Sequence, residues 1–121
     1  MVADPELEAM ITRYLAAYEA GDGAGCAAVF TEDAEMHSPF GPPAIGRDAI
    51  AREHEAWFEE PGEDKRIEVL SWGRDGRLGH AVLRWQARVE DRVEAGMSLA
   101  VLSWAAEEPL FLRLALVPDA A

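Results

Sequence analysis

The sequence predicts an α+β domain in which three N-terminal helices pack on one face of a curved, mostly antiparallel sheet. Three helix-like patterns precede residue 60, and the chain beyond it is strand-like throughout. Helices followed by strands, rather than alternating with them, are typical of this fold class. Short connections between successive strands favour an antiparallel meander. We expect residues 1–121 to form a single domain with one core.

The helices are predicted from capping residues and apolar spacing. Asp4 offers a capping oxygen and Pro5 a preset φ, so the first helix is expected to begin there. Its apolar residues recur every three or four positions until the chain reaches Gly21. A second, short helix is predicted at 22–30 and a third at 47–60, where Pro and Gly follow.

One short and four long strands are predicted. They lie at 34–38, 66–73, 78–90, 93–106 and 110–117. Asp75-Gly76 between two long strands is typical of a two-residue hairpin loop. The segment 39–44 holds three prolines and a glycine, so we expect a loop there rather than a helix or an inner strand.

The faces of the sheet differ in polarity. Apolar and polar residues alternate at 78–90, which predicts one face on the core and one wetter face. The strands at 93–106 and 110–117 carry apolar residues on both faces. In so short a chain the second cover is expected to be another subunit. A homodimer through the sheet is therefore predicted, with a monomer as the alternative.

Composition argues against several classes of partner. The net charge is −12 with an isoelectric point near 4.5, and no basic run exceeds Lys65-Arg66. Such a surface repels nucleic-acid phosphates and anionic membranes, so neither partner is expected. The N-terminus lacks a signal-peptide pattern and no apolar run approaches ~18 residues, which predicts a cytoplasmic protein without membrane spans.

Cofactor chemistry is also not expected. The sequence has no His-Glu-x-x-His pattern, no cysteine pair, no phosphate-cradling glycine loop and no nucleophile elbow. No metal site and no redox cofactor are therefore predicted. Cys26 is the single cysteine and lies among alanines, so we expect a small buried residue rather than a reactive thiol.

A series of short motifs in the first half of the chain carries a family resemblance. They are Arg13-Tyr14-Leu15, Gly21-Asp22, Phe30-Thr31-Glu32-Asp33-Ala34, Ser38-Pro39-Phe40-Gly41 and Gly46-Arg47. In order and spacing, over residues 10–58, they resemble the ketosteroid isomerase branch of the nuclear-transport-factor-2-like (NTF2-like) superfamily, which includes SnoaL-like polyketide cyclases. The resemblance implies a cone-shaped domain that encloses a hydrophobic pocket.

The resemblance also implies catalytic positions. In the isomerase an aspartate shuttles a proton, while a tyrosine and a protonated acid hydrogen-bond the developing oxyanion. Tyr14 falls on the oxyanion tyrosine, Ser38 on the shuttle aspartate, and the second acid should lie near Ala100. A serine needs another base to activate it, and residues 98–103 contain no carboxylate. The isomerase's own reaction is therefore not expected.

His54 replaces a tyrosine that, in the family, hydrogen-bonds the oxyanion tyrosine. A histidine beside Tyr14 could abstract or donate a proton near neutral pH, and the alternative is a satisfied core histidine. Tyr14 itself could equally be a core tyrosine. Ser38 is expected to orient the substrate.

An aromatic, mostly apolar pocket suits a planar hydrophobic ligand. The predicted lining residues are Met36, Trp57, Phe58, Leu83, Trp85, Ala100 and Arg113. The aromatic residues could instead simply fill the core, and Arg113 could bind an anionic substrate group or pair across a dimer contact.

These residues support three hypotheses. The first is a cofactor-independent acid–base enzyme, isomerase- or cyclase-like, that acts on a small hydrophobic cyclic ketone or polyketide-like compound. The second is a binding module that kept the pocket without the chemistry, and the third is a dimeric interaction domain with a filled core.

Overall fold

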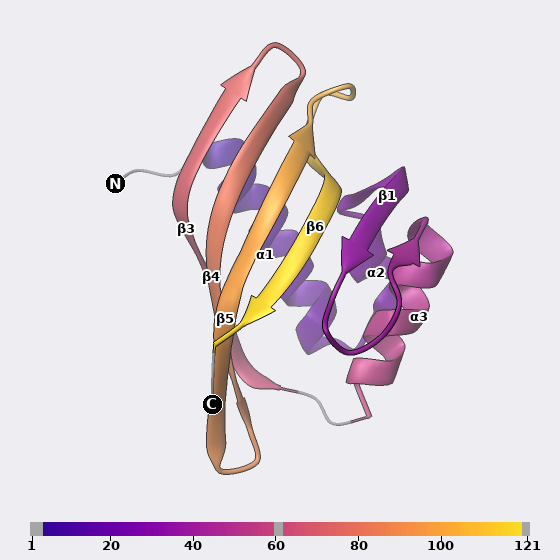
Figure 1. Ribbon diagram of the computed structural model, residues 1–121, viewed down its shortest axis with the longest axis vertical. Helices are drawn as coiled ribbons and strands as arrows, with labels where there is room; N and C mark the ends of the chain where they lie inside the picture. Colours follow the sequence, from indigo (N-terminus) through magenta and orange to yellow (C-terminus); the bar gives the residue numbers. More distant parts are fainter. Residues whose placement is uncertain (1–3, 60–61, 120–121) are drawn as a thin grey trace.

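Three helices cover one face of a six-stranded sheet in the computed structural model, which describes residues 4–59 and 62–119 (Figure 1). This arrangement confirms the predicted α+β fold. The helices are α1 (Pro5–Glu19), α2 (Gly23–Ala27) and α3 (Arg47–Trp57). The strands are β1 (Phe30–His37), β2 (Ala44–Ile45), β3 (Glu63–Asp75), β4 (Leu78–Val89), β5 (Arg92–Ser103) and β6 (Leu110–Pro118).

The start of α1 follows the predicted capping pattern. The Asp4 carboxylate accepts hydrogen bonds from the backbone N–H groups of Glu6 and Leu7, and Pro5 opens the helix. The buried face of the helix consists of Leu7, Met10, Ile11, Tyr14 and Tyr18. This face packs into the core, where the Tyr14 hydroxyl contacts His54 of α3 and the Tyr18 hydroxyl accepts from the Gly62 backbone N–H just before β3.

The sheet has the order β2-β1-β6-β5-β4-β3. Strands β3 to β6 form the predicted antiparallel meander, while β1 pairs with β6 in parallel. The loop between β3 and β4 is Gly76-Arg77, one residue later than predicted, because Asp75 still pairs with Leu78. Gly76 has φ +64°, the left-handed conformation that a tight hairpin loop needs.

Helix α3 ends at Trp57 rather than residue 60, β3 spans 63–75 rather than 66–73, and β5 ends at Ser103 rather than residue 106. Three other boundaries differ from the predictions for tertiary reasons. Strand β1 begins at Phe30 rather than residue 34, because Phe30 pairs with Phe111 of β6 and is fully buried. The short α2 therefore ends at Ala27. Part of the proline-rich segment forms β2, where Ala44 pairs with Met36. The prolines at 39, 42 and 43 predicted a loop up to residue 44, but backbone pairing with β1 extends the sheet to Ala44 and Ile45.

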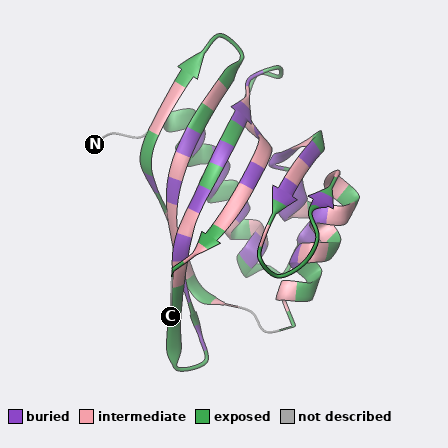
Figure 2. Cartoon of the chain, viewed as in Figure 1, coloured by how far each residue is buried: buried purple, intermediate pink, exposed green. Residues whose placement is uncertain are grey.

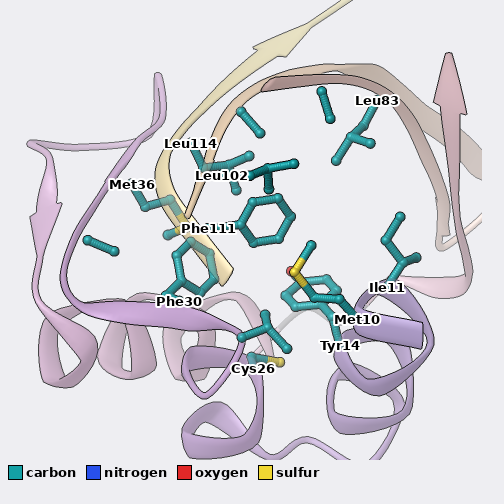
Figure 3. Packing of buried hydrophobic residues seen from close by; sticks show 14 of the residues in the cluster. Met10, Ile11, Tyr14, Cys26, Phe30, Met36, Leu83, Leu102, Phe111 and Leu114 are labelled. Atoms are coloured by element: carbon teal, nitrogen blue, oxygen red, sulfur yellow. The ribbon is translucent and has the colours of Figure 1, made fainter. Parts of the chain in front are cut away.

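The two faces of the sheet have different environments (Figure 2). The concave face carries the core, whose tightly packed members appear in Figure 3. The outer face leaves apolar side chains uncovered: Leu99 is 51% exposed, Val101 39% and Val117 50%. Strands β5 and β6 therefore present apolar residues on both faces, as the sequence predicts.

Gly76→Ala is expected to destabilise the domain by about 1 kcal/mol, because a Cβ strains the left-handed backbone. A Cβ at Gly76 would contact nothing within 4 Å, so the cost reports backbone strain alone. Gly41 also has open space around it but lacks a positive φ. Gly41→Ala is the matched control and should be neutral or slightly stabilising in urea denaturation. Equal stability of the two variants would contradict this account.

Candidate functional site

A cavity of about 410 Å³ lies between α1, the end of α3 and the concave face of the sheet. Its walls are mainly apolar and aromatic. The charged or hydroxyl-bearing side chains in the lining are Tyr14, Tyr18, Lys65, Arg92, Glu94 and Ser98. A cavity of this size and polarity is typical of a site for a small hydrophobic molecule with a few polar groups.

A buried hydrogen bond joins Tyr14, in the cavity wall, to His54 behind it. The Tyr14 hydroxyl lies 2.8 Å from His54 Nε2, and His54 Nδ1 lies 2.8 Å from the Ile50 carbonyl oxygen. Because a carbonyl only accepts, Nδ1 carries the ring proton. Nε2 of the neutral ring is then an acceptor, and Tyr14 donates its hydroxyl proton to it.

Burial keeps both members of this pair neutral. His54 is 0% exposed, and desolvation lowers its pKa to about 4, although the Ile50 carbonyl opposes the shift. Desolvation also raises the pKa of Tyr14 well above its ordinary value. With its proton committed to His54, Tyr14 has oxygen lone pairs that can accept a hydrogen bond but no proton to donate to the cavity that it lines. This direction is the reverse of an oxyanion donor.

The structure brings some of the predicted site residues to the cavity. Tyr14, Trp57, Leu83 and Trp85 line it. His54 does not, because both of its ring nitrogens are occupied within the core and it reaches the cavity through Tyr14.

The other predicted lining residues lie elsewhere. Phe58 packs edge-on against Tyr18, with ring centroids 5.2 Å apart. Met36 and Ala100 are buried in the core away from the lining, and Figure 3 shows Met36 beside Phe30 on the β1 side. Both side chains lie on the buried face of the sheet, but the cavity occupies only part of that face.

Ser38 and Arg113 also differ from their predicted positions. The Ser38 hydroxyl accepts a hydrogen bond from the Phe40 backbone N–H at 3.3 Å, so it shapes the loop after β1 rather than the cavity. Arg113 is paired in register with Glu35 of β1, and their side chains form a 3.3 Å ion pair. Of the two roles considered for Arg113, binding an anionic group in the cavity is therefore not supported.

Five of the charged or hydroxyl-bearing lining residues were not predicted from the sequence: Tyr18, Lys65, Arg92, Glu94 and Ser98. Lys65 lies near the start of β3, and its Nζ lies 4.5 Å from the Tyr18 ring centroid and 5.4 Å from that of Trp85. Burial lowers the pKa of Lys65 to about 8. A signal was present, because Lys65 is the only lysine in a chain with ten arginines.

Glu94 and Ser98 come from β5. Ser98 shares a face with Ala100 and is 5% exposed. Glu94 places a carboxylate in the lining at a position unrelated to either of the acids considered above, and it accepts hydrogen bonds from Arg92 at 3.0 and 3.2 Å. It is half-exposed, so the ion pair belongs to the rim of the cavity.

Three further observations concern the cysteine, possible metal ligands and possible membrane spans. Cys26 is fully buried as predicted, and burial raises the pKa of its thiol to about 12, which keeps it protonated. Within residues 4–59 and 62–119, no three His, Cys, Asp or Glu side chains come together as a metal site. Across that same part of the chain, the helices are too short or too polar to cross a bilayer.

Comparison with known proteins identifies the class of this domain. Residues 11–106 match the SnoaL-like domain family, and the chain belongs to that family. Its fold is that of the NTF2-like proteins, which confirms the resemblance seen in the sequence. No curated protein matches the chain.

Solved structures share this fold at low identity. A ketosteroid isomerase-like protein from Erwinia carotovora atroseptica superposes with a TM-score of 0.78 and 21% identity, covering 94% of each chain. An NTF2-like protein of unknown function from Shewanella oneidensis gives 0.79 and 13%, covering 92% of this chain and 95% of the other. A cystatin-like domain of unknown function from Nostoc punctiforme gives 0.82 and 21%, covering 95% and 76%. These likenesses show the fold alone.

The buried His54 should make folding stability depend on pH. Its folded pKa is lowered from 6.5 to about 4, so between these values the unfolded chain binds a proton that the folded chain does not. The free energy of unfolding should therefore fall by on the order of 3 kcal/mol as pH drops from about 6.5 to 4. Urea denaturation across this range measures the slope.

Two variants isolate the His54 contribution from the carboxylates that titrate in the same range. His54→Gln cannot titrate and should lose this component of the slope, whereas His80→Gln, at an exposed position on β4, should keep it. Identical slopes for the wild type and His54→Gln would show that His54 is not the responsible group.

Proposed function

We propose that this SnoaL-like domain is a cofactor-independent acid–base enzyme, isomerase- or cyclase-like, acting on a small hydrophobic cyclic ketone or polyketide-like compound. The observation that carries the proposal is the Tyr14–His54 hydrogen bond in the wall of an apolar cavity of about 410 Å³. The cavity offers the volume for a ring system, and the pair offers a route for a proton out of it.

The direction of the hydrogen bond defines how the pair would work. The Tyr14 oxygen accepts a proton from the carbon next to the ligand carbonyl while Tyr14 passes its own proton to His54 Nε2. The ligand becomes an enolate and His54 an imidazolium, whose Nδ1–H remains bonded to the Ile50 carbonyl at 2.8 Å. Returning the proton to a different carbon completes an isomerisation.

A hydroxyl that orients the ligand is the remaining requirement. Ser38, first considered for this role, bonds its own loop instead. Ser98 lies in the cavity lining on β5, opposite Leu83 in the strand register, and its hydroxyl supplies a donor toward the ligand oxygen. We assign the orienting role to Ser98 within this proposal.

Exchange of α-protons tests the proposal without knowledge of the natural substrate. Wild-type protein in D₂O should speed deuterium incorporation next to the carbonyl of bicyclic to tetracyclic ketones, followed by NMR. Tyr14→Phe should lower the catalysed rate at least about 100-fold, because the proton acceptor is lost. Tyr18→Phe is the matched control, since Tyr18 also lines the cavity but does not contact His54, and it should retain exchange.

Circular dichroism must accompany this test, because Tyr14→Phe leaves His54 Nε2 buried without a donor. Full exchange activity in a folded Tyr14→Phe protein would overturn the proposed mechanism. Saturable ketone binding in the wild type without any exchange would instead favour the binding module. That alternative is supported by the partners of the polar groups: Tyr14 is bonded to His54, and Glu94 is paired with Arg92.

The uncovered outer face of the sheet supports the proposal of a homodimer. Val82, Leu99 and Ala115 lie side by side in register across β4, β5 and β6. Ion pairs flank this strip, Arg84 with Asp119 and Arg113 with Glu35. A twofold axis through the strip would bury apolar side chains centrally and leave the charged groups at the rim, as stable dimers do.

Sedimentation velocity tests the dimer. The wild type should sediment as a dimer at micromolar concentration, and Leu99→Arg should sediment as a folded monomer, because a charge enters the middle of the strip. Val93→Arg is the matched control: Val93 is 69% exposed but lies at the start of β5, away from the strip, and this variant should stay dimeric. A monomeric wild type would refute this interface.

A further inference from the structure

Lys65 occupies an unusual position for a lysine. Its Nζ contacts the rings of Tyr18 and Trp85, at 4.5 and 5.4 Å from their centroids, and its side chain lines the cavity. Within the part of the chain that the structure describes, it forms no ion pair or hydrogen bond. The nearby Glu94 is committed to Arg92 instead. The amine is held by aromatic faces, and the Glu94 carboxylate stabilises its charged form without a hydrogen bond to it.

The groups that surround Lys65 do not compete for its lone pair. Its Nζ lies over the Tyr18 ring of α1, and its charge interacts with the Cys26 thiol of α2 and with His54 of α3. Burial raises the pKa of Tyr18 and Cys26 and lowers that of His54, so all three groups stay neutral at pH 7. From β5 it faces the Arg92–Glu94 pair. Burial lowers the pKa of Lys65 itself to about 8, which leaves roughly a tenth of the amine unprotonated at pH 7.

We propose that Lys65 is a nucleophile that captures a hydrophobic aldehyde or ketone in the cavity as an imine. The Nζ lone pair attacks the carbonyl carbon, the C=O π bond breaks, and one N–H proton moves to the oxygen to give a carbinolamine. The hydroxyl then leaves with the second N–H proton as one water molecule, and the nitrogen lone pair forms the C=N bond. The step needs no oxidant or reductant. Apolar walls favour it, because they hold a flat ligand against the amine and exclude water.

The inference deepens the proposed function, on which it rests for the class of ligand, a carbonyl compound. It does not depend on the roles of Tyr14 and His54. The cavity volume of about 410 Å³ admits a fused bicyclic ligand. The sequence makes the chemistry easy to follow, since apart from the α-amino group the chain has no other primary amine.

Reductive trapping tests the inference. The protein is incubated at pH 7.5 with 2-naphthaldehyde and cyanoborohydride, which reduces an imine to a stable secondary amine. Intact-mass measurement counts the adducts, and peptide mapping separates Lys65 from the α-amino group. Labelling of Lys65 should saturate with ligand concentration, as binding at a site requires, whereas labelling of the α-amino group should rise linearly.

Arg52→Lys provides an internal reference, because it adds an exposed lysine on α3 to the same molecule. Lys65 should be labelled at least about tenfold faster than the lysine so introduced, since far more of its amine is unprotonated. Lys65→Arg keeps the charge and should abolish labelling at this position. Labelling of Lys65 no faster than at the introduced lysine would overturn the inference.

The outcomes separate this inference from the proposed function. Labelling should persist in Tyr14→Phe, in which α-proton exchange is lost. Wild-type protein that exchanges ketone α-protons but is not labelled at Lys65 would overturn the inference and leave the proposed function standing. Labelling without exchange would uphold the inference and overturn the acid–base function.

Discussion

The hydrogen bond between Tyr14 and His54 is the interaction on which the site depends. It joins α1 to α3 across 40 residues of sequence, and the helix itself fixes its direction. The Ile50 carbonyl, one turn before His54, takes the Nδ1 proton and so makes Nε2 the acceptor. Removal of either partner leaves a buried polar atom unsatisfied, which is costly in a low-dielectric core. The bond therefore holds α1 to α3 and fixes the direction of the Tyr14 hydroxyl proton.

Desolvation by the same core sets the charge of the titratable groups in and behind the cavity wall. It raises the pKa of Tyr14 and lowers those of His54 and Lys65, so each shift favours the neutral form. At pH 7 Tyr14 and His54 are therefore neutral, whereas Lys65 is still mostly protonated. The acidic residues that give the chain its net charge of −12 lie mainly on the protein surface, away from the cavity. The Arg92–Glu94 ion pair adds charge at the rim of the cavity.

Sequence patterns predicted the fold well and the site in part, for physical reasons. Helical spacing and strand alternation report which face is buried, so Tyr14, Leu83 and Trp85 were placed correctly. They do not report where packing is incomplete, so Met36 and Ala100 could not be told from lining residues. Position within a family motif also could not reveal that the Ser38 hydroxyl turns back to its own loop. Lys65 was considered only as half of the basic run Lys65-Arg66, because its contact with the cavity depends on aromatic residues distant in sequence, Tyr18 and Trp85.

The departures from the isomerase pattern can be understood as one change in the way a carbonyl is activated. For Tyr14 to donate into the cavity, His54 would have to be protonated, which costs on the order of 4 kcal/mol at pH 7 for a pKa of about 4. With Tyr14 as an acceptor and no second acid near Ala100, the proposed enolate has the Ser98 hydroxyl as its assigned donor. The proposed protonated imine on Lys65 would withdraw electrons more strongly than the carbonyl it replaces, and so would acidify the neighbouring carbon with less need of such donors. Tyr14 then needs only to receive the proton, which is the role its hydrogen bond allows.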